Sequence, residues 1–243
     1  MEEYTTMTTQ PNQMNPINMN FNAPVQNAVG QNEGGIHNYA SDVTSTELKE
    51  IRQSRKILIL AANPKATTPL RLDEEVREIN SVLQRAKKRE QFDLRQLWAV
   101  RIRDVSHALV DEKPQIVHFS GHGAGDEGLV LENETGQVQF VNAEALAGLF
   151  ELFANRIECV ILNACYSEVQ AEAIFKHIPY VIGMNKALGD RAAIEFAVGF
   201  YDALGAGESI EFAYKLGCKA IQLAGIPEHL TPKLKKKPES LPL

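Results

Sequence analysis

The segment KILILAANPKATTPLRLDEEVREI, Lys56–Ile79, joins a strand pattern to a helix pattern. Its first part, Lys56–Ala62, is almost entirely apolar, which is typical of a strand that is covered on both faces. From Leu72 the apolar residues recur at helical spacing, and the expected helix extends to Lys88. Acidic residues lie in its first turn and basic residues in its last, an order that complements the helix dipole. The segment therefore predicts one βα unit of a parallel sheet.

The same alternation of strand and helix continues along the chain. Strands are expected at residues 92–100, 115–119, 157–163 and 180–184, and helices at residues 102–110, 142–153, 167–178, 191–204 and 209–223. The stretch Gly128–Val141 predicts a hairpin that turns at Glu134–Gly136. Repeated βα order implies right-handed crossovers between parallel strands. We therefore predict an α/β fold with a mostly parallel sheet and helices on both faces.

The composition argues against a membrane protein and a nucleic-acid-binding protein. The 243 residues carry a formal net charge of −6, so no broad basic surface is expected to replace the counterions of a nucleic acid. No stretch approaches the roughly eighteen apolar residues of a transmembrane helix, and the N-terminus lacks a signal-peptide pattern. The three cysteines are odd in number and form no C-x-x-C pair, which favours a reducing compartment. We expect a cytoplasmic protein with no membrane or nucleic-acid partner.

The composition also divides the chain into three parts. Residues 1–48 contain no Lys or Arg and are rich in Asn, Gln, Thr and Gly. An ordinary α/β composition follows, so we assign residues 49–230 to one folded domain. Residues 231–243 combine lysines with prolines and are expected to form a solvated, extended tail.

Two of the expected strands end at residues that can form a nucleophile–base pair. IVHFSGHG, Ile116–Gly123, ends on His122 and a glycine, and CVILNAC, Cys159–Cys165, ends on Cys165. The carboxyl ends of parallel strands meet at one edge of a sheet, so we expect both side chains there. The helix expected after Cys165 favours a thiolate through its dipole, and an imidazole can act as the base.

Backbone groups beside these two residues complete the candidate site. Gly123 has no Cβ, so a substrate can approach its backbone closely. The N–H groups of Gly123 and Cys165 are the expected donors to the oxyanion of a tetrahedral intermediate. Cys159 lies within a strand and Cys218 lies on the polar side of a helix without an evident base, so neither is expected to be a nucleophile. His118 lies inside an apolar strand and is expected to be a hydrogen-bonded core residue.

Two further motifs do not fit a cofactor or a metal. GAGDEG, Gly123–Gly128, matches G-x-G-x-x-G, but a strand follows it, and Asp126 and Glu127 would repel a pyrophosphate. His118 and His122 are four residues apart, like two zinc ligands, but they span the end of a strand rather than a helical turn. We expect no cofactor and no metal.

The two strand-end motifs, HFSGHG (His118–Gly123) and LNACYS (Leu162–Ser167), resemble the catalytic motifs of the CHAT domain, a caspase-like peptidase domain often joined to tetratricopeptide repeats. The resemblance continues through Asp190–Tyr214 and covers roughly residues 56–230. It implies that Cys165 is the nucleophile and His122 the general base and acid, with the oxyanion hole formed as above. The implied fold is a caspase-like three-layer sandwich.

The resemblance leads us to expect a caspase-like cysteine endopeptidase with a protein substrate. A catalytically silent pseudo-protease that acts as an interaction module is the alternative. A flavodoxin-like ligand binder ranks last, because the loop Asn63–Leu70 contains no glycine. Asn163 stands where some relatives that cleave after Arg or Lys carry Asp, so no basic P1 preference follows from it. Asp190 and Met184 could line the specificity pocket, although a helix cap and a core residue are the simpler expectations.

The segment FNAPVQNAVGQNEGGIHNYA, Phe21–Ala40, has low charge and short β-prone pieces between glycines. Its Asn and Gln residues suit stacked cross-β packing. It resembles amyloid-signalling motifs that precede effector domains in some bacterial and fungal proteins, which implies self-assembly or an upstream sensor acting through residues 21–40. The simpler expectation is that this Asn/Gln-rich N-terminal segment is a disordered polar leader ahead of the folded domain.

Overall fold

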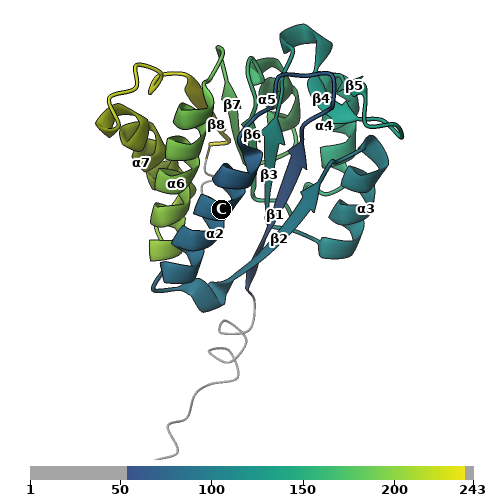
Figure 1. Cartoon of the computed structure of the whole chain (residues 1–243). Helices are drawn as coiled ribbons and strands as arrows, with labels where there is room; N and C mark the ends of the chain where they lie inside the picture. The colour runs from purple at the N-terminus through teal and green to yellow at the C-terminus, as the bar shows by residue number, and fades with distance from the viewer. Residues whose placement is uncertain (1–53, 239–243) are drawn as a thin grey trace, which may run out of the picture. The chain divides into compact units, whose positions relative to one another are not determined.

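The structure is a computed structural model that describes residues 54–238. The strands are β1 (Arg55–Ala62), β2 (Phe92–Trp98), β3 (Ile116–Gly121), β4 (Leu129–Glu132), β5 (Val138–Val141), β6 (Cys159–Asn163), β7 (Tyr180–Met184) and β8 (Pro232–Lys236). Six of them form one sheet in the order β2–β1–β3–β6–β7–β8 (Figure 1). All neighbours in this sheet are parallel except β7 and β8. The predicted segment 1–48 lies outside the described residues.

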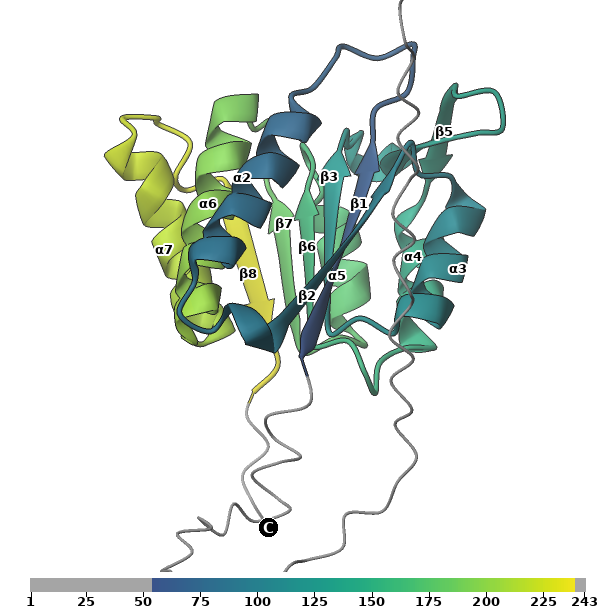
Figure 2. The same cartoon turned by 60° about the horizontal axis from the view of Figure 1, so that its bottom comes forward.

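Helices cover both faces of this sheet (Figure 2). They are α2 (Leu72–Arg85), α3 (Ile102–Glu112), α4 (Ala143–Glu151), α5 (Glu168–Phe175), α6 (Asp190–Ala206) and α7 (Ile210–Leu223), with short 3-10 turns η1 (Arg89–Gln91) and η2 (Gly125–Glu127). The core on one face contains residues of α2, α6 and α7, and the core on the other contains residues of α3, α4 and α5. The predicted α/β sandwich with a mostly parallel sheet is confirmed.

The alternation of side chains along β1 explains why the strand is apolar throughout. Ile57 and Ile59 pack into the core beneath α2 and α6, whereas Leu58 and Leu60 pack into the opposite core. Successive side chains of a strand point to opposite faces, so a strand with helices on both sides needs apolar residues at every position. Every residue of β3 and β6 is likewise buried.

The order of the strands creates a switch point beside β1. The chain leaves β1 through α2 on one face of the sheet and leaves β3 toward the hairpin and α4 on the other face. The loops after β1 and β3 therefore diverge at neighbouring strand ends. Ligands of open α/β sheets bind in the crevice that such divergence opens.

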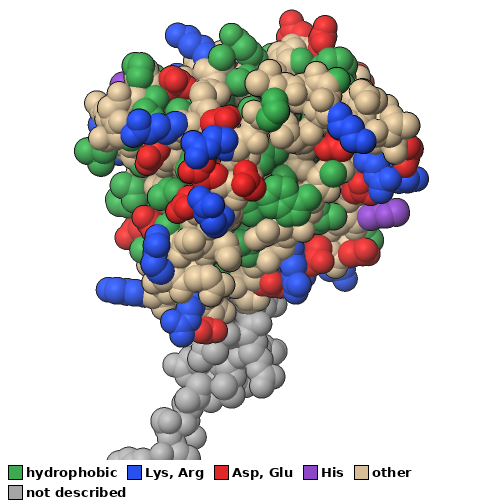
Figure 3. Space-filling view, viewed as in Figure 1, with side chains coloured by type: hydrophobic (Ala, Val, Ile, Leu, Met, Phe, Trp, Pro, Cys, Tyr) green, Lys and Arg blue, Asp and Glu red, His purple; other side chains and the backbone are tan. Residues whose placement is uncertain are grey.

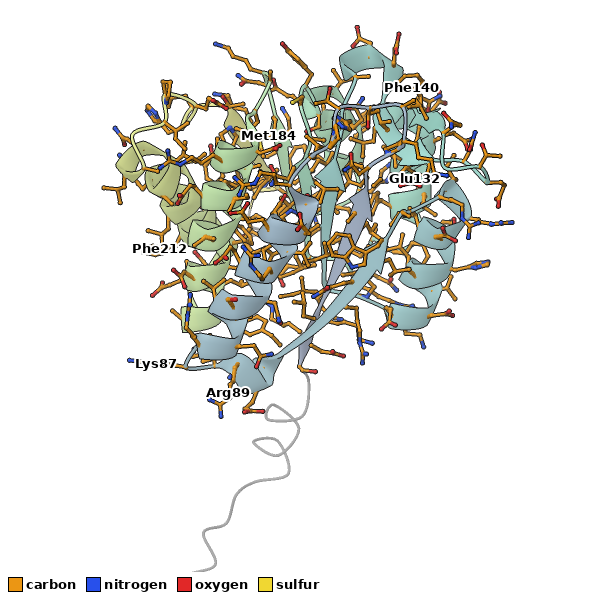
Figure 4. All side chains as sticks on the ribbon, in the orientation of Figure 1. Lys87, Arg89, Glu132, Phe140, Met184 and Phe212 are labelled. Carbon is orange, nitrogen blue, oxygen red and sulfur yellow. The ribbon has the colours of Figure 1, made fainter. Side chains whose placement is uncertain are left out.

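The predicted hairpin is present as β4 and β5, which pair antiparallel around Gly136. Glu132 of this hairpin is buried and accepts a hydrogen bond from the Asn63 N–H at 3.3 Å, whereas Phe140 is exposed on the outside (Figure 4). The hairpin is thereby tied to the loop that follows β1.

The predicted tail, residues 231–243, differs from the expectation in its first residues. Pro232–Lys236 forms β8, which pairs with β7 as the last strand of the sheet. Leu234 packs against the core, and Lys235 forms ion pairs with Glu168 and Glu172. Lysine-rich sequences suit edge strands because their charge discourages pairing with another chain. The prediction of a tail was therefore wrong for Pro232–Lys236, because a lysine-rich composition is also typical of an edge strand.

Helix α2 is shorter than the expected helix, which reached Lys88. It ends at Arg85 because Ala86 adopts an extended backbone conformation, and Lys87 lies beyond the helix near Arg89 (Figure 4). Of the predicted basic residues, Arg85 alone remains in the last turn. On the face shown in Figure 3, basic, acidic and hydrophobic side chains are all exposed.

Candidate active site

His122 follows the last residue of β3, and the loop after β1 holds its ring. Its Nε2 lies 2.9 Å from the backbone oxygen of Thr68. A carbonyl oxygen only accepts, so Nε2 must carry a proton, and Nδ1 is the basic nitrogen of the neutral ring. The loop between β1 and α2 thus sets both the orientation and the tautomer of this imidazole.

Cys165 is half-buried, two residues beyond the end of β6. Its Sγ accepts a hydrogen bond from the Leu188 N–H at 3.3 Å and lies 3.6 Å from the backbone oxygen of the same residue. Leu188 belongs to the loop between β7 and α6. The sulfur is therefore positioned by backbone atoms rather than by a side chain.

His122 and Cys165 line the same pocket at the carboxyl edge of the sheet. The structure therefore brings together the two residues that the sequence singles out, although they are far apart in the chain. The loop before α2, the ends of β3 and β6 and the start of α6 supply the remaining walls. These walls include Leu70, Arg71, Glu75, Ser120, Asn163 and Asp190.

Gly123 lies against the backbone of Cys165. A Cβ on Gly123 would come within 2.1 Å of the Cys165 carbonyl oxygen, so no larger residue fits without displacing that backbone. Within residues 54–238, no hydrogen bond uses the N–H of Gly123 or of Cys165. Tyr166 follows with a φ of 54°, in the left-handed region that costs a non-glycine residue about 1 kcal/mol. The backbone around the sulfur is thus closely packed and has two free donors.

Beneath the pocket lies a buried polar network centred on Glu75. Its carboxylate accepts hydrogen bonds from Asn163 Nδ2 (2.7 Å), His118 Nε2 (3.0 Å) and Ser120 Oγ (2.5 Å). The other ring nitrogen of His118 lies 3.1 Å from the Tyr201 hydroxyl. The expectation that His118 is a hydrogen-bonded core residue is confirmed, since its side chain is fully buried.

The network keeps Glu75 ionised in spite of its burial. Burial alone raises the pKa of a carboxyl group, but the hydrogen bonds and charge of His118, with the bonds from Ser120 and Asn163, hold the pKa of Glu75 below its ordinary value. The network joins α2 to the ends of β3 and β6. These are the strands that lead to His122 and Cys165.

Asp190 and Met184 have different surroundings. Asp190 is the first residue of α6 and lines the pocket, where its Oδ2 accepts a hydrogen bond from the Arg71 N–H at 3.4 Å. The N-cap of α6 is Gly189, so the expectation of Asp190 as a helix cap is wrong. Met184 is fully buried in the core at the end of β7, as expected (Figure 4).

The other two thiols lie in less reactive surroundings. Cys159 is fully buried at the start of β6, and its burial raises its pKa far above the ordinary value. Cys218 lies on α7 near Tyr214, and its burial also raises its pKa. Neither residue lines the pocket that holds His122.

The sequence analysis missed several groups of this site, among them Thr68, Leu188 and Glu75. Thr68 and Leu188 act through backbone atoms, which no side-chain pattern reveals. Glu75 did leave a signal, because it falls beside Val76 and four residues before Ile79, on the buried face of the helix. A carboxylate on a buried helix face indicates a paired or functional group.

The α/β sandwich resembles the fold of a caspase. A crystal structure of the Drosophila initiator caspase Dronc matches with a TM-score of 0.50 and 9% identity, over 75% of this chain and 79% of that chain. This likeness concerns the fold. The family described as CHAT domain matches residues 29–215, so the chain belongs to the CHAT domain family.

Two curated relatives extend this comparison. A Roc-COR-CHAT protease of an unknown prokaryotic organism is 28% identical over 163 residues, which cover 64% of this chain and 15% of the relative. A probable protease of Gillisia limnaea is 24% identical over 145 residues, which cover 59% of this chain and 26% of the relative. The matched part is thus only 15% and 26% of the relatives' own lengths. None of the helices within residues 54–238 is long and apolar enough to cross a membrane.

Proposed function

We propose that this chain is a cysteine endopeptidase in which Cys165 is the nucleophile and His122 the general base and acid. Membership of the CHAT domain family and similarity to relatives named as proteases support this proposal. The position of both side chains on one pocket supports it independently. The single observation that carries it is the bond from His122 Nε2 to the Thr68 carbonyl, since it leaves Nδ1 to take a proton.

The first half of the reaction forms a thioester. His122 Nδ1 takes the proton of the Cys165 thiol, and the thiolate attacks the carbonyl carbon of the scissile peptide bond. The negative charge that develops on the carbonyl oxygen is stabilised by the N–H groups of Gly123 and Cys165. His122 then gives the proton to the departing amine nitrogen, and the carbon–nitrogen bond breaks.

The second half regenerates the enzyme. His122 takes a proton from water, and the resulting hydroxide attacks the thioester carbon through a second oxyanion at the same two donors. The carbon–sulfur bond breaks, the acid product leaves, and the proton returns to the sulfur. The Thr68 carbonyl stabilises the imidazolium in both halves because it accepts a hydrogen bond from Nε2–H throughout.

Cleavage of a peptide library by the full chain tests this proposal. We expect Cys165→Ala to lower kcat/KM by at least about 10³-fold, as loss of a nucleophile does in hydrolases of this kind. Cys218→Ala is the matched control and should keep the wild-type rate. Equal, zero turnover by every form, including forced oligomers, would instead indicate the pseudo-protease.

We also propose that assembly through residues 21–40 raises this activity in the cytoplasm. These residues lie outside the described part, and the proposal rests on their low charge and Asn/Gln content. Deletion of residues 1–48 should abolish any rise of activity per molecule with protein concentration. An identical concentration dependence with and without the segment would contradict this mode of activation.

A further inference from the structure

Asn163, which lines the pocket beside Cys165, carries a buried acceptor without a partner among the described residues. Asn163 is 5% exposed, and its Oδ1 is buried without a hydrogen-bond partner among the described residues. Its Nδ2 donates to Glu75 at 2.7 Å and to the Ala193 carbonyl at 3.3 Å. Rotation of the amide by half a turn would lose both bonds, so Oδ1 is fixed as the free group. A buried carbonyl without a donor is costly, which indicates a site for a ligand that supplies one.

A carboxylate, that of Glu75, lies next to this amide. The three donors to Glu75 are the side chains of His118, Ser120 and Asn163, none of which is Lys or Arg. His118 contacts Glu75 through Nε2 at 3.0 Å, and its Nδ1 lies 3.1 Å from the Tyr201 hydroxyl. No Lys or Arg side chain therefore donates to this carboxylate.

The rim of the pocket adds a second carboxylate. Asp190 is half-buried where α6 begins, and it lines the pocket with Glu75. Arg71 also lines the pocket, but its guanidinium pairs with Glu74 outside it and is 62% exposed. The residues that line the pocket thus include two carboxylates and one carbonyl oxygen without a donor, and the one guanidinium among them is paired elsewhere.

We propose that this pocket binds the basic side chain, Lys or Arg, of the substrate residue that precedes the cleaved bond. The ammonium and guanidinium groups are positively charged and only donate hydrogen bonds, which matches the Asn163 oxygen and the carboxylates of Glu75 and Asp190. This inference rests on the proposed function, since Cys165 must be the nucleophile for the pocket to be its neighbour. This proposal does not require an Asp at position 163. Helix α2 supplies a carboxylate instead, that of Glu75, which accepts a hydrogen bond from Asn163.

Paired substrates that differ in charge and little in shape test this inference in the full chain. Peptides with Lys or norleucine, and with Arg or citrulline, are compared at the residue before the cleaved bond. We expect kcat/KM to be at least tenfold higher for the charged member of each pair. Equal rates within both pairs, or faster cleavage after the neutral residue, would overturn the proposal.

Variants then assign the preference to the carboxylates. Glu75→Gln should reduce the Lys-to-norleucine ratio at least tenfold, whereas Glu78→Gln, on the same helix but outside the pocket, should leave the ratio unchanged. The ratio is measured within each protein, so a general loss of activity cancels. If Glu75→Gln does not fold, Asp190→Asn carries the test and should reduce the ratio about threefold; an unchanged ratio would overturn the proposal.

The same assay separates this inference from the proposed function. Turnover that depends on Cys165 but not on the charge of the substrate residue before the cleaved bond would overturn only the proposed preference for Lys or Arg. No turnover of any peptide by any form would overturn both.

Discussion

The sulfur of Cys165 differs from the other two in its surroundings. It is half-buried, contacts the Leu188 backbone and shares a pocket with His122, whereas burial raises the pKa of both Cys159 and Cys218. The thiolate is the reactive form of cysteine, so a raised pKa slows alkylation.

Alkylation of the native chain by iodoacetamide near neutral pH should therefore modify Cys165 first. We expect its rate to exceed that of Cys218 by at least about tenfold, with no modification of Cys159 until the chain unfolds. Peptide mass mapping over time measures this order, and denatured protein, in which all three should react, is the control. Faster labelling of Cys218 would contradict the account of the three thiols.

A side chain at position 123 would clash with the backbone of Cys165. Gly123→Ala places a Cβ 2.1 Å from the Cys165 carbonyl oxygen, so we expect the backbone at both proposed oxyanion donors to shift. Loss of one such donor lowers kcat by about 10²-fold or more. Gly148→Ala in α4 is the matched control, because its Cβ meets nothing within 4 Å and should stabilise the helix by about 0.5–1 kcal/mol. Wild-type turnover by Gly123→Ala would exclude the proposed role.

At the scale of elements, Glu75 links α2 to the ends of β3 and β6, and this link depends on pH. The pKa of Glu75 is lowered in the folded chain, so below its ordinary value, about 4.3, the unfolded chain binds a proton that the folded chain does not. The contribution of Glu75 to stability is complete above that pH and is lost as the pH falls toward the folded pKa.

Denaturant unfolding of wild type and Glu75→Gln between pH 3 and 7 measures this link. We expect the variant to be less stable at pH 7 by about 1–3 kcal/mol, the usual cost of disturbing a buried hydrogen-bonded group. The difference should shrink as the pH falls below about 4.3. A difference that stays constant over the whole range would show that ionised Glu75 does not stabilise the fold.

Strand β8 is an element whose loss should be measurable. It covers the edge of β7, and Leu234 packs into the core. Deletion of residues 231–243 should lower Tm by at least about 5 °C, since each 1 kcal/mol corresponds to about 2–4 °C in a domain of this size. An unchanged Tm would support the solvated tail that the composition predicts.

How far the sequence predicts each element depends on how many faces are buried. Strands β1, β3 and β6 are covered on both sides, and their continuous apolar runs identify them. Strand β8 is an edge strand with only Leu234 and Pro232 as apolar residues, so its sequence looks like that of a tail. The end of a helix depends on the backbone conformation of single residues, such as the extended Ala86. The spacing of apolar residues does not predict that conformation.

At the scale of the whole molecule, the parallel sheet brings the two strand ends together. That topology follows from the βα order, so the shared pocket of His122 and Cys165 could be predicted from the sequence. The contacts of Thr68 and Leu188 could not, because they are made by backbone atoms of loops. The grouping of Glu75 and Asn163 in this pocket could not be predicted either, since these residues come from different elements, α2 and β6.

The central claim is that Cys165 attacks a peptide carbonyl with His122 as its base. Intact-mass analysis of the full chain after reaction with a peptidyl acyloxymethyl ketone tests this claim most directly. We predict one covalent adduct, mapped to Cys165, and its loss in Cys165→Ala and in His122→Ala, whereas His107→Ala forms it at the wild-type rate. An adduct on Cys218, or labelling of Cys165 at the same rate without His122, would contradict the claim.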